Sequence, residues 1–84
     1  MMLEEIIENY SDVDILKADG FDSAVIGVSN DFTAPRLIYS VAKCLAILTE
    51  NPDMDVKDAL EYFSFNISGA YIGELTPIWC WDIY

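Results

Sequence analysis

The side chains that most often carry enzyme chemistry are scarce in this chain. It has no histidine, so the usual base of serine and cysteine hydrolases and the commonest neutral metal ligand are both missing. Its two cysteines, Cys44 and Cys80, are fewer than the four ligands of a structural zinc site. The sequence therefore excludes triad hydrolases and histidine-rich zinc sites, and it predicts no cofactor and no bound metal.

Carboxylates are the remaining groups that could act as acid and base or bind Mg²⁺ or Ca²⁺. The densest group comprises Asp12, Asp14, Asp19 and Asp22. The glycine and the final glutamate of a calcium-binding loop are missing from the required offsets, and the four glycines of the chain form no phosphate-binding motif. We interpret this group as a solvated acidic loop.

Residues 66–77 contain glycine, proline, tyrosine and asparagine at a higher density than a simple connection between elements needs. Two glycines and a proline could shape a backbone pocket there, and the candidate ligand-binding residues are Asn66, Tyr71, Glu74 and Thr76. In a purely structural alternative, Asn66 hydrogen-bonds the backbone of an ordered loop that Tyr71 pins to the core. An enzyme built on this loop would need a pocket lined by at least two acids.

The C-terminal aromatic residues are the second candidate site. Over 78–83, one set of side chains alternates with another, Trp79, Trp81 and Ile83 against Ile78, Cys80 and Asp82. This period of two predicts a strand with both tryptophans on one side. Helices could bury that side in the core. A terminal strand can also be a sheet edge open to another chain, and Trp and Tyr often anchor interfaces. The candidate interface residues are Ile78, Trp79, Trp81 and Tyr84.

Hydrophobic spacing predicts the elements of the first half. Leu3, Ile6, Ile7 and Tyr10 follow helical spacing. The β-branched run at 24–28 predicts a strand. Residues 36–39 either begin a helix at Pro35 or form the second strand of a hairpin. We favour the hairpin, because it gives the first strand a partner.

The second half is predicted to hold two helices before the terminal strand. In the hairpin interpretation, Ser40 caps a helix that reaches about Glu50, and Asp55 caps the next one. The buried face of the later helix is predicted to be Val56, Ala59, Leu60, Phe63 and Ile67. The predicted fold class is α+β: helix, β-hairpin, two helices and C-terminal strand, with a three-stranded antiparallel sheet and the helices packed on one face.

Length and charge narrow the classes of partner. Eighty-four residues predict a single domain over 1–84, and the net charge of −11 disfavours direct binding to nucleic acid or to an anionic membrane. No apolar run reaches the length of a membrane span and no export signal is present, so we expect a cytoplasmic protein with reduced cysteines. The acids either only keep the chain soluble or face a partner protein with a basic surface.

The second half resembles a group of small uncharacterised proteins encoded by tailed phages and bacteria. The resemblance spans about residues 19–82 and is carried most specifically by Phe65-Asn66-Ile67-Ser68-Gly69-Ala70-Tyr71-Ile72-Gly73-Glu74 and Thr76-Pro77-Ile78-Trp79. In that group, a Gly-Phe-Asp segment like the one at 20–22 precedes the hairpin. The resemblance brings no assigned activity. It implies an accessory protein that acts on host machinery in the host cytoplasm.

The function that these features favour is a small acidic interaction protein without enzyme activity. It would act by binding a partner or by self-assembly, and we expect a homodimer formed through Ile78 to Tyr84. The alternative is a protein that binds a small ligand, or a carboxylate- or metal-dependent enzyme, with its site at the 66–77 loop.

Overall fold

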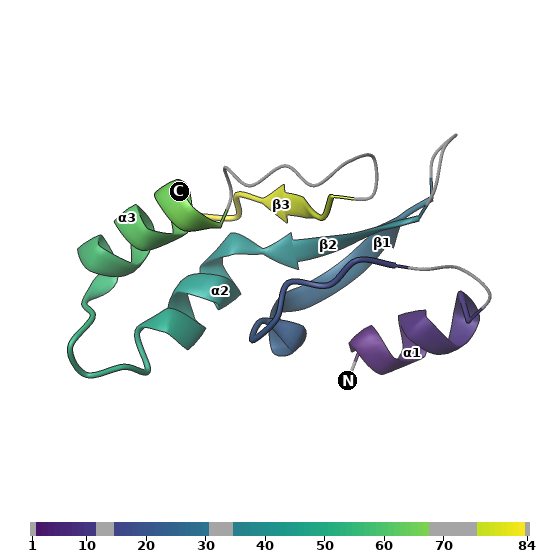
Figure 1. Ribbon diagram of the computed structural model, residues 1–84, viewed down its shortest axis with the longest axis horizontal. Coiled ribbons are helices and arrows are strands. Elements are labelled where there is room, and N and C mark those ends of the chain that lie inside the picture. The colour runs from purple at the N-terminus through teal and green to yellow at the C-terminus, as the bar shows by residue number, and fades with distance from the viewer. Residues whose placement is uncertain (1, 12–14, 31–34, 68–75, 84) are drawn as a thin grey trace.

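The computed structural model describes residues 2–11, 15–30, 35–67 and 76–83. Its elements are the helix α1 (Met2–Asn9), a 3₁₀ turn (Asp22–Ala24), the strands β1 (Val25–Ser29) and β2 (Arg36–Ser40), the helices α2 (Val41–Leu48) and α3 (Val56–Asn66), and the strand β3 (Ile78–Cys80). Figure 1 shows α1 beneath β1, and α2 and α3 extending beyond one end of the sheet. No helix in these ranges is long and apolar enough to cross a membrane.

The hairpin predicted for residues 24–39 is confirmed. β1 and β2 pair antiparallel, with Ser29 opposite Arg36 and Val25 opposite Tyr39, and a bulge lies between Val25 and Gly27. β2 leads directly into α2, because Ser40 ends the strand and its side chain accepts the N–H of Lys43 as the helix N-cap. A helix starting at Pro35 is therefore wrong.

The prediction of a fully antiparallel sheet is wrong. The strand order is β1-β2-β3, and β3 runs parallel to β2, with Tyr39 opposite Trp79. Parallel neighbours need a long crossover, and the segment containing α2 and α3 provides it. The fold is α+β, with three helices and a mixed three-stranded sheet.

The core lies where β2 meets the helices. Leu37 and Tyr39 of β2 are fully buried, whereas Ile38 between them is only partly buried, so one face of the strand supplies the core. Cys44 of α2 and Phe63 of α3 are also fully buried. Val56, predicted to be buried, is 67% exposed because it begins α3 at the helix end farthest from Phe63.

The C-terminal strand is shorter than predicted. The alternation at 78–83 predicts six residues, but β3 ends at Cys80, and a backbone bond from Asp82 N to Cys80 O turns the chain. The Asp82 carboxylate then accepts hydrogen bonds from Ser40 Oγ at 2.5 Å and from Ala42 N at 2.9 Å. Asp82 therefore leaves the strand to cap the N-terminus of α2.

Candidate functional site

A pocket of about 220 Å³ lies between the segment that precedes β1 and the C-terminal part of the fold. The first side is formed by residues 17–21, which approach the 3₁₀ turn. The second side is formed by the end of α3 and the start of β3. The described lining residues are Lys17, Ala18, Asp19, Phe21, Asn66, Ile67, Pro77 and Trp79.

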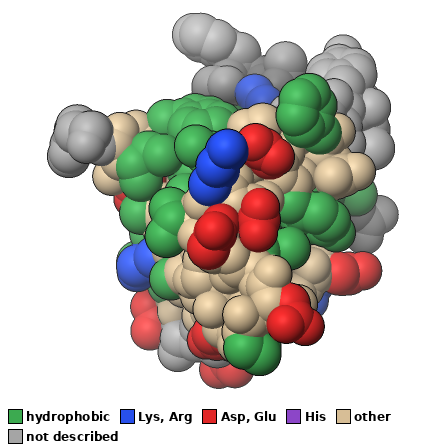
Figure 2. Space-filling view, turned by 90° about the vertical axis from the view of Figure 1, so that its left-hand side faces the viewer, with side chains coloured by type: hydrophobic (Ala, Val, Ile, Leu, Met, Phe, Trp, Pro, Cys, Tyr) green, Lys and Arg blue, Asp and Glu red, His purple; other side chains and the backbone are tan. Residues whose placement is uncertain are grey.

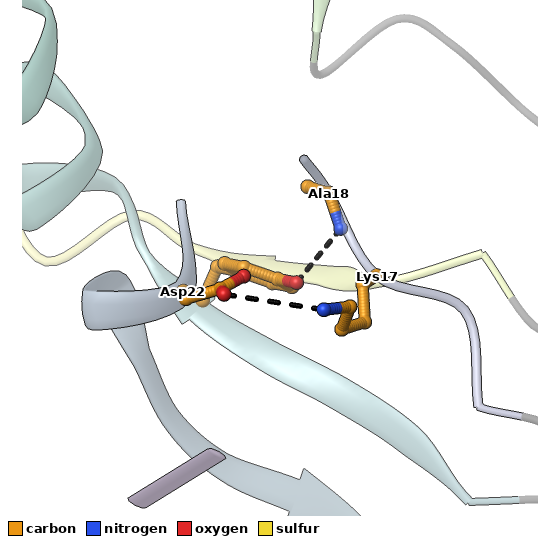
Figure 3. Close-up of polar contacts among 4 residues, drawn as sticks. Lys17, Ala18 and Asp22 are labelled. Atoms are coloured by element: carbon orange, nitrogen blue, oxygen red, sulfur yellow. Dashed lines mark hydrogen bonds and ion pairs between the residues drawn. The ribbon is translucent and has the colours of Figure 1, made fainter. Parts of the chain in front are cut away.

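Tyr39 links the two sides of the pocket. Its hydroxyl accepts the backbone N–H of Ala18 at 2.8 Å, and its ring lies 5.1 Å from that of Trp79. The dashed line at Ala18 in Figure 3 marks this hydrogen bond. Burial raises the pKa of Tyr39 above its ordinary value, so the hydroxyl stays neutral. Tyr39 thus fastens the N-terminal segment to the sheet at the pocket wall.

Trp79 forms part of the pocket wall and part of the core. Its ring packs edge-on against Phe63 at 5.2 Å as well as against Tyr39. Its Nε1 atom is buried and has no hydrogen-bond acceptor in the described part of the chain. The indole N–H is a donor only, so it is unsatisfied within the described residues.

Lys17 and Asp19 line the same pocket with opposite charges. Lys17 also forms an ion pair outside the lining, since its Nζ lies 3.9 Å from a carboxylate oxygen of Asp22, and these two side chains are 41% and 46% exposed, respectively. Figure 3 shows this ion pair beside the Ala18 hydrogen bond. Such an exposed pair contributes little stability. Asp19, the other charged lining residue, is exposed.

The candidate ligand loop contributes one of its four predicted residues to the described pocket lining. Asn66 lies there, and its Nδ2 donates to the carbonyl of Tyr62 at 3.2 Å. Thr76 is buried, and its carbonyl accepts Arg36 Nε at 2.7 Å, which ties the start of β3 to β2. Tyr71 and Glu74 lie outside the described residues.

The two tryptophans of the candidate interface differ in solvent exposure. Both rings contact Phe63, Trp81 at 5.5 Å, but Trp79 is partly buried whereas Trp81 is 48% exposed. Ile78 is partly buried, and Tyr84 lies outside the described residues. Trp79 is therefore mainly a packing residue, and Trp81 is the aromatic residue that β3 leads to the surface.

Further apolar side chains are exposed next to Trp81 in the sequence and on the helix that it contacts. Phe65 is 83% exposed, Tyr62 45% and Ile83 39%. We call these exposed residues, Tyr62, Phe65, Trp81 and Ile83, the C-terminal surface. Phe65 follows Phe63 by two positions in α3, so it lies about 200° around the helix from the ring that Trp81 contacts. Figure 2 shows the end of the molecule that carries α2 and α3, where hydrophobic side chains reach the surface beside acidic ones.

Sequence reasoning missed the N-terminal side of the pocket. Lys17 and Phe21 are 45 or more positions from Asn66 in the chain, and no local pattern links them. It also missed the capping role of Asp82. A polar residue at the end of an apolar segment was the available signal, but Ala42, whose N–H it accepts, lies 40 positions earlier in the chain.

The thiols and acids of the described ranges form no metal site. No group of three or more potential ligands is close enough there to hold an ion. Cys44 and Cys80 are both free thiols. Burial raises the pKa of Cys44 to about 11, and the nearby Asp82 carboxylate adds to the shift.

Comparisons with protein-family models, with curated proteins and with solved structures found no match for this chain. The physical features of the molecule therefore carry the functional argument.

Proposed function

We propose that this chain is an interaction protein without enzyme activity that forms a homodimer through the C-terminal surface and the adjoining edge of β3. The observation that carries the proposal is Trp81, which is held against Phe63 at 5.5 Å and yet is 48% exposed. A large aromatic side chain already fixed in place loses little conformational freedom on binding. Such residues are the usual anchors of protein interfaces.

The edge of the sheet supports the same proposal. β3 is the last strand in the order β1-β2-β3, so one side of its backbone is open within the described sheet. An edge strand can pair with a strand from another chain. β3 has only three residues, so edge pairing alone would bury little surface. The exposed aromatic residues must supply most of the contact.

The negative charge of the chain predicts how salt should affect a homodimer. Each copy carries a net charge of −11, so two copies repel each other at low ionic strength. Salt screens this repulsion over about 10 Å at 0.1 M. A homodimer should therefore become stronger with added salt, whereas a complex with a basic protein should become weaker.

Fewer observations support the alternative, an enzyme built on carboxylates. Asp19 is the one acid among the described pocket residues, whereas the predicted enzyme site requires at least two. The resemblance to small phage and bacterial proteins agrees with an accessory role and stays a prediction.

Two matched substitutions test the proposed surface. Trp81→Ser should weaken self-association by at least about tenfold, because it removes the proposed anchor. Val56→Ser is the control, since it removes a side chain that is 67% exposed at the opposite end of α3. Sedimentation equilibrium measures both dissociation constants.

Equal dissociation constants for the two variants would contradict the proposed surface. Circular dichroism checks that each variant is folded. If Trp81→Ser unfolds, Ile83→Ser replaces it, because Ile83 belongs to the same surface and is 39% exposed.

A further inference from the structure

The pocket beside Trp79 has a mainly apolar lining and room for a molecule smaller than a typical drug. Its volume of about 220 Å³ is below the roughly 300–1,000 Å³ of sites for drug-sized ligands. Phe21, Ile67, Pro77 and Trp79 make its wall mainly apolar. A molecule of one or two fused rings is the size of ligand that fits.

The unsatisfied donor of Trp79 indicates what such a ligand should carry. Burying an N–H group without an acceptor is unfavourable, and buried donors in proteins are nearly always paired. The nearby Tyr39 hydroxyl already accepts the N–H of Ala18 at 2.8 Å. Within the described residues, Trp79 Nε1 has no acceptor and is shielded from solvent. The proposal therefore requires the ring to turn so that its N–H reaches the pocket wall, where an acceptor on the ligand can pair with it.

The charges around the pocket favour a ligand without net charge. Lys17 and Asp19 line it with one positive and one negative group. The net charge of −11 over the whole chain repels anions. A cation would gain nothing from the indole N–H, which is a donor.

We propose that this pocket binds a small, uncharged, planar heteroaromatic molecule whose ring nitrogen or carbonyl accepts a hydrogen bond from Trp79 Nε1. The ring packs against the apolar wall, and the acceptor provides the specificity. The pocket shares β3 with the proposed interface through Trp79, but none of its lining residues belongs to the C-terminal surface, and ligand binding does not require self-association.

Two nearly isosteric probes test the proposal on the unmodified chain. Benzimidazole and indole share two fused rings and one N–H, but only benzimidazole has a ring nitrogen that accepts a hydrogen bond. We expect benzimidazole to bind about fivefold more tightly, as one additional hydrogen bond implies. Titrations followed by ¹H–¹⁵N NMR give both dissociation constants, and the Trp79 indole N–H signal should move downfield with benzimidazole alone.

The two tryptophans provide matched variants. Trp79→Phe keeps an aromatic ring and removes the N–H, so it should abolish the preference for benzimidazole. Trp81→Phe makes the same change outside the pocket and should retain that preference. Equal binding of the two probes to the unmodified chain would overturn the proposal, and so would the absence of saturable shifts at millimolar concentration. If Trp79→Phe does not fold, the probe comparison and the Trp79 signal still decide the question.

Discussion

Asp82 is the side chain that fastens the C-terminal segment to the rest of the fold. Its carboxylate accepts hydrogen bonds from Ser40 Oγ and from Ala42 N, at the N-terminal end of α2. Negative charge is favoured at this end of a helix. These hydrogen bonds hold the pKa of Asp82 below its ordinary value. The residue after Trp81 thus fixes the direction in which the chain leaves β3.

The contribution of Asp82 to stability should depend on pH. Because its pKa is lower in the folded state than in the unfolded state, the carboxylate stabilises the fold above the ordinary value of 3.8, and this contribution is lost as the pH falls through the folded-state pKa. The stability difference between the unmodified chain and Asp82→Ala should be largest at neutral pH and shrink in acid. Urea unfolding at a series of pH values measures it. A difference that stays constant down to pH values well below 3.8 would contradict this role.

The two cysteines should differ sharply in reactivity. Cys44 is fully buried and its pKa is raised to about 11, whereas Cys80 is partly buried. The thiolate is the reactive form of cysteine, so iodoacetamide at mildly alkaline pH should label Cys80 of the native protein well before Cys44. Unfolding should expose both thiols. Mass spectrometry locates the label, and equal native rates would show that Cys44 is not enclosed.

At the scale of the elements, α3 is held by a cap at its start and by Phe63 near its middle. Asp55 accepts the N–H of Asp58 at 2.8 Å as the N-cap. Phe63 contacts the rings of both tryptophans. α3 therefore contacts Trp81 through Phe63 and borders the pocket through Asn66 in its last turn.

Removing the Asp55 cap should destabilise the protein by about 1 kcal/mol, because the N–H of Asp58 loses its acceptor. Asp53→Ala is the matched control, since it removes the same side chain and charge from the α2–α3 loop without touching the cap. Its effect should stay within about 0.5 kcal/mol. Thermal or urea unfolding compares the two variants, and equal losses would mean that Asp55 acts through charge alone.

The elements also show which features could be predicted from the sequence. Helix caps and the hairpin depend on residues close in the chain, and Ser40, Asp55 and the β-branched run at 24–28 carry those signals. The direction of β3 does not depend on its own residues, since an alternating strand reads the same in either pairing. It depends on where the crossover through α2 and α3 returns the chain.

The pocket was predicted in part, for a related reason. The 66–77 segment stands out locally, and Asn66 and Pro77 do line the pocket. The opposite side comes from residues 17–21, which reach it through the bond between Ala18 N and the Tyr39 hydroxyl. A hydrogen bond between residues 21 positions apart does not change the hydrophobic pattern of either segment, so the sequence does not indicate it.

At the scale of the whole molecule, a small core leaves several large apolar side chains at the surface. Among the described residues, the exposed aromatic side chains are Tyr62, Phe65 and Trp81, and all three belong to the C-terminal surface. An isolated exposed apolar residue needs no explanation. Trp81 contacts α3 through Phe63 and follows a strand whose outer edge has no partner within the described sheet, and this is the reason to assign an interface there.

Light scattering on the unmodified chain at micromolar concentration, at low and at high salt, is the most direct test of self-association. We expect a mass twice the 9.5 kDa of one chain, with a larger dimer fraction at the higher salt concentration because salt screens the repulsion between two copies that each carry a charge of −11. A mass of 9.5 kDa under both conditions would contradict the account. The exposed aromatic residues would then have to serve a different, basic partner, whose binding salt should weaken.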